Sequence, residues 1–131
     1  MDDRQEFADC RNCRCLAARK EAQRVSRLYD QKLRPHGLTI NQFSMLSTLI
    51  LAGPLAMAAL AEWLGIERTT LTRNVSVAEK AGLVALGHGD DRRERIVRLT
   101  PGGRRRAEEA LPAWRAAQAS ASPSEKNIPP Q

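Results

Sequence analysis

Aromatic and catalytic side chains are scarce in this sequence. Only 4% of its 131 residues are aromatic, so its core must be built mainly from Leu, Val, Ile and Ala. Two His residues leave few groups for acid–base chemistry near neutral pH. The sequence has no Gly-rich phosphate loop and supports no Ser-His-Asp or Cys-His arrangement. We therefore expect neither an enzyme nor a bound cofactor.

Long hydrophobic runs are absent as well. No stretch of roughly 18 apolar residues occurs, so no segment is expected to cross a membrane. The N-terminus contains Asp2 and Asp3 and lacks the apolar segment of a signal peptide. We expect a cytoplasmic protein without a membrane partner, whose three cysteines are reduced thiols rather than a disulfide framework.

Positive charge is present in excess and is concentrated in one segment. The net charge is +6, and residues 68–106 alone carry ten Lys or Arg against four Asp or Glu. The rest of the chain, with eleven residues of each sign, is neutral. This distribution predicts an acidic partner, with nucleic acid as the first choice. RNA-binding modules usually stack bases on exposed aromatic side chains, and this segment has none. Double-stranded DNA is therefore favoured, and a non-specific basic module is an alternative.

Helical periodicity dominates the first half of the sequence. A stripe of apolar residues without internal Pro or Gly predicts a helix over residues 9–34, which the Pro-His-Gly sequence at 35–37 ends. Thr39 and Gln42 form a capping box that begins the next helix. A short, poorly capped helix is expected over residues 57–64.

The second half combines a helix, a hairpin and a final helix. A helix is expected over residues 68–81, followed by β-prone stretches at 83–86 and 96–99. The turn-rich, charged connector between these stretches is typical of a hairpin. A Thr-Pro pair begins a last helix at 100–118, and the polar, Pro-rich residues 119–131 are expected to form a disordered tail. The predicted fold class is mainly α with a small β-hairpin.

A helix, a Gly-containing turn and a second helix can present that second helix to the major groove of DNA. In the helix at 68–81, apolar residues at 71, 75 and 78 form the buried stripe. The opposite face has no acidic residue, and its short side chains let the backbone approach base edges while Arg bonds guanine. A solvated surface helix would usually mix Glu with Lys, so DNA binding is favoured. The outward residues are Thr69, Arg73, Ser76 and Lys80, with Thr72 on the flank.

The charged connector of the hairpin supports the same function. Arg92 and Arg93 can reach a minor groove, where narrow A·T-rich stretches concentrate negative potential. Asp91 is placed to orient the Arg93 guanidinium by a charge-assisted hydrogen bond. Next to a recognition helix, this hairpin is interpreted as a wing.

Several linked blocks of the sequence resemble the MarR (multiple antibiotic resistance) family of regulators. The match runs from about Cys15 to Gln118, and its blocks are Gly37–Thr39, Gln42-Phe43, Leu60–Leu64, Arg68–Asn74, Glu79–Val84, Asp91–Arg93 and Leu99-Thr100. The resemblance implies a winged helix-turn-helix domain over residues 1–118. Its DNA-binding module lies at about 39–99, and its N- and C-terminal dimerisation helices lie at about 9–34 and 100–118. The implied DNA contacts are Arg68, Thr69, Thr70, Thr72, Arg73, Ser76, Lys80, Asp91, Arg92 and Arg93.

The same resemblance implies a sequence-specific transcriptional regulator, a repressor that binds its operator as a homodimer. A small ligand, often aromatic, would relieve repression from a cleft between the dimer helices and the winged module. Phe43, Met45 and Trp63 either border this cleft or belong to the core, and the core is the simpler interpretation. Family members usually continue beyond the equivalent of Gln118 with another long helix. Because the polar tail stands there instead, we expect a weaker or differently built dimer.

Cys10, Cys13 and Cys15 form a C-x-x-C-x-C pattern near the start of the first helix. A structural metal site needs four ligands and only three thiols are near, so no metal is expected. Redox sensing is an alternative, because Cys15 is similar in position to the reactive cysteine of the organic-hydroperoxide-sensing branch of the family, and Tyr29 is similar in position to a tyrosine of that branch. Two tyrosines that support this cysteine in that branch are replaced here by Arg19 and Ile40. Incidental thiols in a reducing compartment are the simpler interpretation.

Overall fold

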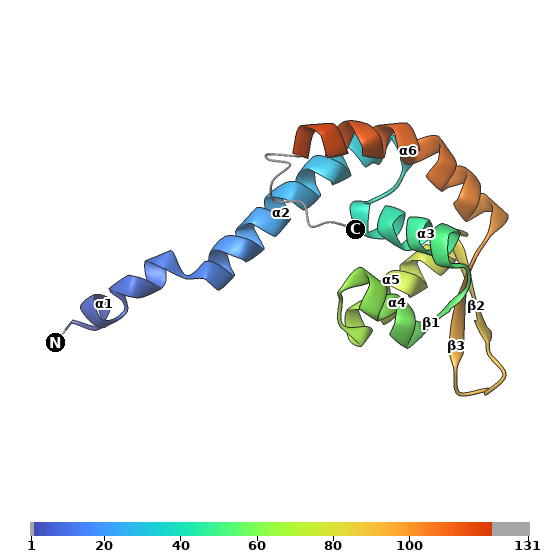
Figure 1. Ribbon diagram of the computed structural model, residues 1–131, viewed down its shortest axis with the longest axis horizontal. Coiled ribbons are helices and arrows are strands. Elements are labelled where there is room, and N and C mark those ends of the chain that lie inside the picture. The colour runs from blue at the N-terminus through green and yellow to red at the C-terminus, as the bar shows by residue number, and fades with distance from the viewer. Residues whose placement is uncertain (1, 122–131) are drawn as a thin grey trace.

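The computed structural model describes residues 2–121, which form a mainly helical protein with one small antiparallel sheet (Figure 1). The predicted fold class is confirmed. The elements in chain order are α1 (Asp3–Glu6), η1 (Ala8–Asn12), α2 (Arg14–Leu33), η2 (Arg34–His36), α3 (Ile40–Ala52), β1 (Leu55–Ala56), α4 (Met57–Leu64), α5 (Arg68–Lys80), β2 (Val84–His88), β3 (Arg95–Leu99) and α6 (Pro101–Ala121).

The helix predicted over residues 9–34 is divided at Cys13. This residue has an extended backbone (φ −63°, ψ 115°), so α2 begins at Arg14, and η1 precedes the break. Every residue from 2 to 24 is exposed except the half-buried Cys13, and we call this segment the N-terminal arm. It extends away from the rest of the chain in Figure 1. The later part of α2 packs on α6, where the rings of Tyr29 and Trp114 lie 6.5 Å apart.

The helix-turn-helix unit begins with the capping box that the sequence predicts. The Thr39 hydroxyl accepts the backbone N–H of Gln42 at 3.1 Å, and the Gln42 side chain accepts the backbone N–H of Thr39 at 3.0 Å. α4 ends at Leu64 and is capped by Gly65, whose φ of 65° is left-handed and therefore suits glycine. The short turn after α4 leads directly into α5, which is the second helix of the helix-turn-helix unit.

The sheet holds the wing on the helical core. Its strand order is β1-β3-β2, with Val97 of β3 paired to Leu55 on one side and to Leu86 on the other. The β2–β3 hairpin matches the predicted one. β1 was not predicted, because two residues are too few to show an alternating pattern.

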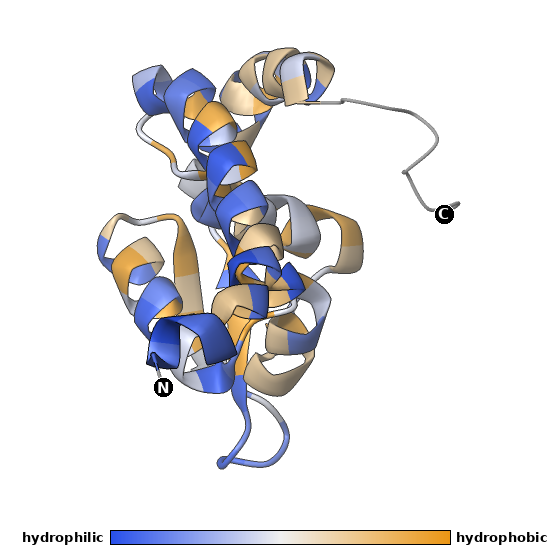
Figure 2. Cartoon of the chain, turned by 90° about the vertical axis from the view of Figure 1, so that its left-hand side faces the viewer, coloured by the Kyte–Doolittle hydropathy of each residue, from blue (hydrophilic) through white to orange (hydrophobic). Residues whose placement is uncertain are grey.

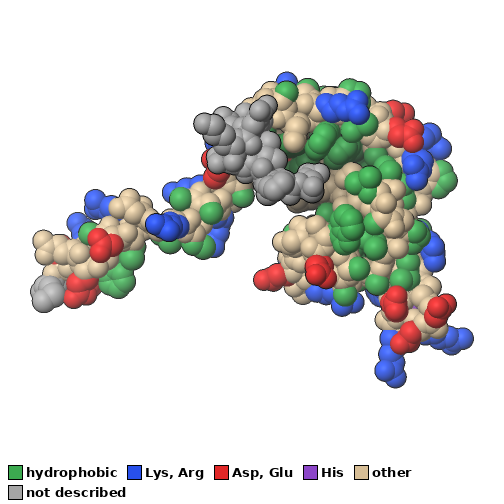
Figure 3. Space-filling view, in the orientation of Figure 1, with side chains coloured by type: hydrophobic (Ala, Val, Ile, Leu, Met, Phe, Trp, Pro, Cys, Tyr) green, Lys and Arg blue, Asp and Glu red, His purple; other side chains and the backbone are tan. Residues whose placement is uncertain are grey.

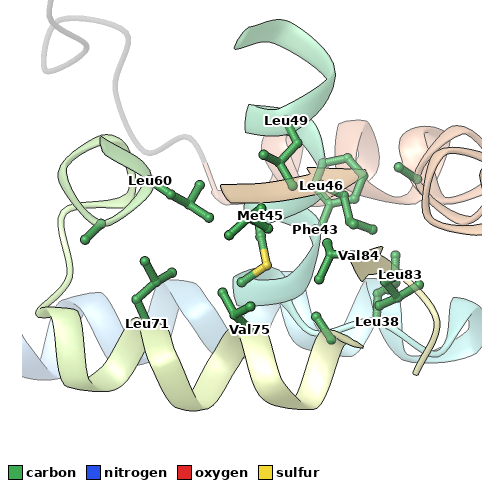
Figure 4. Packing of buried hydrophobic residues seen from close by; sticks show 14 of the residues in the cluster. Leu38, Phe43, Met45, Leu46, Leu49, Leu60, Leu71, Val75, Leu83 and Val84 are labelled. Atoms are coloured by element: carbon green, nitrogen blue, oxygen red, sulfur yellow. The ribbon is translucent and has the colours of Figure 1, made fainter. Parts of the chain in front are cut away.

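The core is formed where α5 packs beneath α3 and α4. Leu71, Val75 and Ala78 are each 0% exposed, which confirms the buried stripe predicted for α5. Figure 4 shows Leu71 and Val75 pointing toward Leu60 of α4 and Met45 of α3. Complete burial of such a side chain contributes on the order of 1.5–3 kcal/mol. This packing fixes which face of α5 is left for solvent or a ligand.

The last helix is longer than predicted. α6 continues through Pro112 to Ala121 and bends in Figure 1, so residues 119–121 are helical rather than part of a tail. The rest of the predicted tail, residues 122–131, lies outside the described residues. None of the helices between residues 2 and 121 has the length and hydrophobicity needed to cross a bilayer.

Candidate DNA-binding surface

α5 presents the polar face that the sequence predicts. Arg68, Thr69, Thr72, Arg73 and Lys80 are exposed, and Thr70 and Ser76 are half-buried. The Thr72 hydroxyl donates to the backbone oxygen of Arg68 at 2.9 Å, so its hydrogen is used within the helix. Glu67, the residue before the helix, makes no side-chain cap, so the first backbone amides of α5 are not occupied by it. The outward side of the helix therefore combines hydroxyl and guanidinium groups.

One apolar residue, which the sequence does not mark as a binding residue, also lies on the outward side of α5. Val77 is 57% exposed on α5, although it is apolar. The sequence signal is that Val77 lies outside the buried 71, 75, 78 stripe, so helical periodicity leaves this apolar side chain unburied.

The wing tip is held by hydrogen bonds within its own turn and carries guanidinium groups without a carboxylate partner. The Asp91 carboxylate accepts the backbone N–H of Arg93 at 2.9 Å, and the backbone N–H of Glu94 donates to the Asp91 carbonyl at 2.9 Å. The predicted bond from Asp91 to the Arg93 guanidinium is not observed, and the carboxylate instead accepts the backbone N–H of the same residue. The one salt bridge within residues 2–121 joins Arg24 to Glu21 on the arm. Both wing-tip guanidiniums, of Arg92 and Arg93, are thus exposed without a carboxylate partner. Figure 2 shows the hydrophilic tip projecting from the body.

A tight joint connects α5 and the wing to α6. The Thr100 hydroxyl lies 2.6 Å from the carbonyl oxygen of Gly82 and 3.0 Å from that of Leu83, and accepts the backbone N–H of Gly103 at 2.9 Å. The Thr100 backbone N–H also donates to the Leu83 oxygen at 3.2 Å. A Cβ atom added to Gly103 would lie 2.1 Å from that oxygen, so only glycine fits. These contacts tie the start of α6 to Gly82 and Leu83, the residues that join α5 to β2.

An apolar groove lies on the other side of the helix-turn-helix unit. It measures about 450 Å³ and is lined by residues of α3, α4 and α6, among them Phe43, Leu51, Trp63 and Trp114. Hydrophobic side chains gather there in Figure 3. The rings of Phe43 and Trp114 stack at 6.0 Å. Trp63 is 60% exposed on the rim and is not a core residue, whereas Met45 is buried and does not line the groove.

The three cysteines are accessible on the N-terminal arm. Cys10 and Cys15 are exposed, Cys13 is half-buried, and the backbone N–H of Cys13 donates to the Cys10 carbonyl at 3.2 Å. No group of three potential metal ligands occurs in the part of the chain that the structure describes. Tyr29 stands fourteen residues after Cys15 on α2, about 21 Å along the helix. Its hydroxyl donates to the side-chain oxygen of Gln118, and burial raises the pKa of its phenol. One protomer therefore does not bring Cys15 and Tyr29 together.

Comparison with known proteins agrees with this geometry. A sequence profile described as the MarR family matches residues 36–94. The transcriptional regulator MosR of M. tuberculosis, solved in complex with DNA, is 41% identical, with a TM-score of 0.81 over 89% of this chain and 86% of that chain. The chain belongs to the MarR family.

Two further relatives extend this assignment. YwoH of Bacillus subtilis (strain 168), described as an uncharacterized HTH-type transcriptional regulator, is 31% identical over 90 residues. These residues make up 69% of this chain and 66% of YwoH, just under two thirds of its length. Reduced AbfR bound to DNA has a TM-score of 0.73 and 26% identity, over 88% of this chain and 85% of that chain. The MarR family is a family of DNA-binding transcriptional regulators.

Proposed function

We propose that this MarR-family protein is a sequence-specific repressor that binds its operator as a homodimer. In this proposal α5 enters the major groove and Arg93 of the wing enters the flanking minor groove. The observation that carries the proposal is the outward face of α5 around Arg73, which has Thr, Ser, Arg and Lys while the exposed Glu79 lies on a flank, beside a wing tip with unpaired guanidinium groups. The half-sites are expected about 10 bp apart, because two modules related by a dyad meet one face of DNA one helical turn apart.

The N-terminal arm supports the homodimer. Isolated helices of this length are marginally stable in water, and the described residues offer the arm no packing partner within its own chain. A second copy can bury Phe7 and Leu16, which are 64% and 46% exposed. α2 and α6 would then form the dimer interface, with one α5 hanging beneath each side.

The apolar groove supports relief of repression by a small aromatic ligand. A flat ring can stack on the Phe43 and Trp114 side chains, and the groove touches both α3 and α6. A ligand shifts the equilibrium only by its differential affinity for two conformations. Because the joint ties α6 to α5, a ligand that favours another position of α6 would change the spacing of the two recognition helices.

The contribution of the wing is tested by replacing Arg93 with alanine. We expect weaker binding to operators flanked by A·T-rich DNA and a smaller loss when the flanks are G·C-rich, because the narrow A·T minor groove concentrates negative potential. Fluorescence anisotropy with matched DNA pairs measures both affinities. An equal loss on both kinds of flank would contradict the minor-groove assignment and reduce Arg93 to a phosphate contact.

Thiol-based redox sensing is a second candidate function. It is favoured by the three accessible thiols on the arm that the proposed dimer would bury in part. The neighbour AbfR was solved bound to DNA in both a reduced and an overoxidized form. Oxidation of an arm cysteine adds polar atoms or a cross-link where the two protomers would meet, and would thereby alter the spacing of the recognition helices.

A peroxide titration tests this candidate. We expect operator affinity to change on oxidation, the change to reverse with dithiothreitol, and Cys15→Ser to abolish it if Cys15 is the sensor. Cys10→Ser and Cys13→Ser serve as matched controls on the same arm. Unchanged affinity after complete oxidation, verified by mass spectrometry, would remove the redox function.

A further inference from the structure

The exposed large hydrophobic residues of the described chain fall into three places. Phe7 and Leu16 lie on the N-terminal arm, and Leu51 and Trp63 lie at the apolar groove. Val77 stands apart on α5, where no other large apolar side chain is exposed. In the proposed function a dimer partner would cover Phe7 and Leu16, and a groove ligand would contact the surface near Leu51 and Trp63. Neither explains why Val77 is exposed.

Val77 lies on the outward face of α5. Successive residues of an α-helix are rotated by about 100°, so Val77 lies one turn after Arg73 and two turns after Thr70. The buried stripe of Leu71, Val75 and Ala78 points roughly 125° away from it. Glu79, the carboxylate of α5, lies on the other flank, roughly 160° around the helix. Val77 is therefore grouped with the basic and hydroxyl residues of the recognition face.

The side chain of Val77 borders an open hollow that its own chain leaves unfilled. The hollow measures about 270 Å³ and lies between α5 and the start of α3. Its other lining residues are mostly polar, among them Asn41, Gln42 and Asn74. The carboxylate that also lines it, Asp30, is engaged with the backbone N–H of Ile40 at 2.7 Å. An apolar group from outside the protein can thus reach Val77 without displacing a packed side chain.

We propose that Val77 contacts the C5-methyl group of a thymine and makes α5 prefer thymine at one position of each half-site. This inference rests on the proposed placement of α5 in the major groove. The thymine methyl is the apolar group that base pairs present in that groove, and cytosine has a hydrogen there instead. Valine has no hydrogen-bonding group, so it can discriminate only through such a contact. Arg73, one turn away, would read a neighbouring base by hydrogen bonds.

The test removes the methyl groups from the DNA and the matching side chain from the protein. The upstream intergenic DNA is prepared with thymine or with uracil, which pairs identically but lacks the C5-methyl group. Loss of one buried methyl group corresponds to about a fourfold loss of affinity, or about 15-fold for two half-sites. We expect this loss for the unaltered protein and a ratio near one for Val77→Ala. Circular dichroism confirms that the variant is folded, since this position is mostly exposed.

A matched variant separates Val77 from its neighbours. Thr72→Ser removes a methyl group from the opposite flank of α5, roughly 140° around the helix from Val77, and keeps the hydroxyl that donates to Arg68. If Thr72→Ser abolishes the thymine preference, or if Val77→Ala retains it, Val77 is not the reader. Specific binding that ignores uracil substitution overturns this inference alone. Absence of specific binding to either DNA overturns the proposed function together with it.

Discussion

Replacing Gly103 with alanine is expected to lower the free energy of unfolding by about 2–3 kcal/mol. The new Cβ atom would lie 2.1 Å from the carbonyl oxygen of Leu83, which is backbone and cannot rotate away. Relief requires α6 to move away from β2, and this movement strains the hydrogen bonds of Thr100 to Gly82 and Leu83. The melting temperature is expected to fall by roughly 6–15 °C in circular dichroism. Operator affinity is expected to fall as well, because the joint sets the position of α5 and the wing relative to α6.

Gly102 provides a matched control in the same turn of α6. A Cβ atom there would meet the Gly82 oxygen at 3.5 Å and the Thr100 hydroxyl at 3.8 Å, which are ordinary contacts. Gly102→Ala is therefore expected to be neutral or to stabilise the helix by up to about 1 kcal/mol. Equal stability of the two variants would contradict the joint as the rigid connection between α6 and α5.

Replacing Arg73 with alanine is expected to reduce operator affinity by about 1–3 kcal/mol, roughly 5- to 150-fold. The guanidinium is exposed on the outward face of α5, where it can bond guanine through two hydrogen bonds. The loss is expected to depend on sequence: the variant tolerates all bases at the position that Arg73 reads, while its affinity for unrelated DNA changes little. Anisotropy titrations against operators with single base-pair changes measure both effects.

Arg105→Ala is the charge-matched control. It removes one exposed positive charge from the same basic segment but lies on α6, outside the recognition face. We expect a small loss of affinity that is uniform across sequences and decreases with salt, because only long-range attraction to phosphate is weakened. If Arg73→Ala behaved in the same way, α5 would bind DNA through its backbone charge alone and would not read bases.

Features that depend on short stretches of sequence could be predicted. The capping box of Thr39 and Gln42 joins residues three apart, and the buried stripe of α5 follows the helical period. The β2–β3 hairpin was predicted from its turn-rich connector. Each of these is specified by neighbours along the chain, so one sequence is sufficient to find it.

Features that depend on contacts between distant residues, or on a choice between competing hydrogen-bond donors, could not be predicted from the sequence. β1 exists because Leu55 and Ala56 meet β3 some forty residues later. The Asp91 carboxylate can accept a hydrogen bond from either the guanidinium or the backbone N–H of Arg93. The sequence does not indicate that the backbone N–H is the donor in the folded chain. The requirement for glycine at position 103 arises from the carbonyl of Leu83, which only the folded chain brings near. The exposure of Trp63 likewise depends on how α4 packs beside α3.

The most direct test of the central claim is sedimentation velocity of the protein with its own upstream intergenic DNA at low and moderate salt. A complex of two protomers per site is predicted, which weakens as salt rises and survives an excess of unrelated competitor DNA. Binding that competitor removes completely, or a monomer in every condition, would contradict a sequence-specific dimeric regulator.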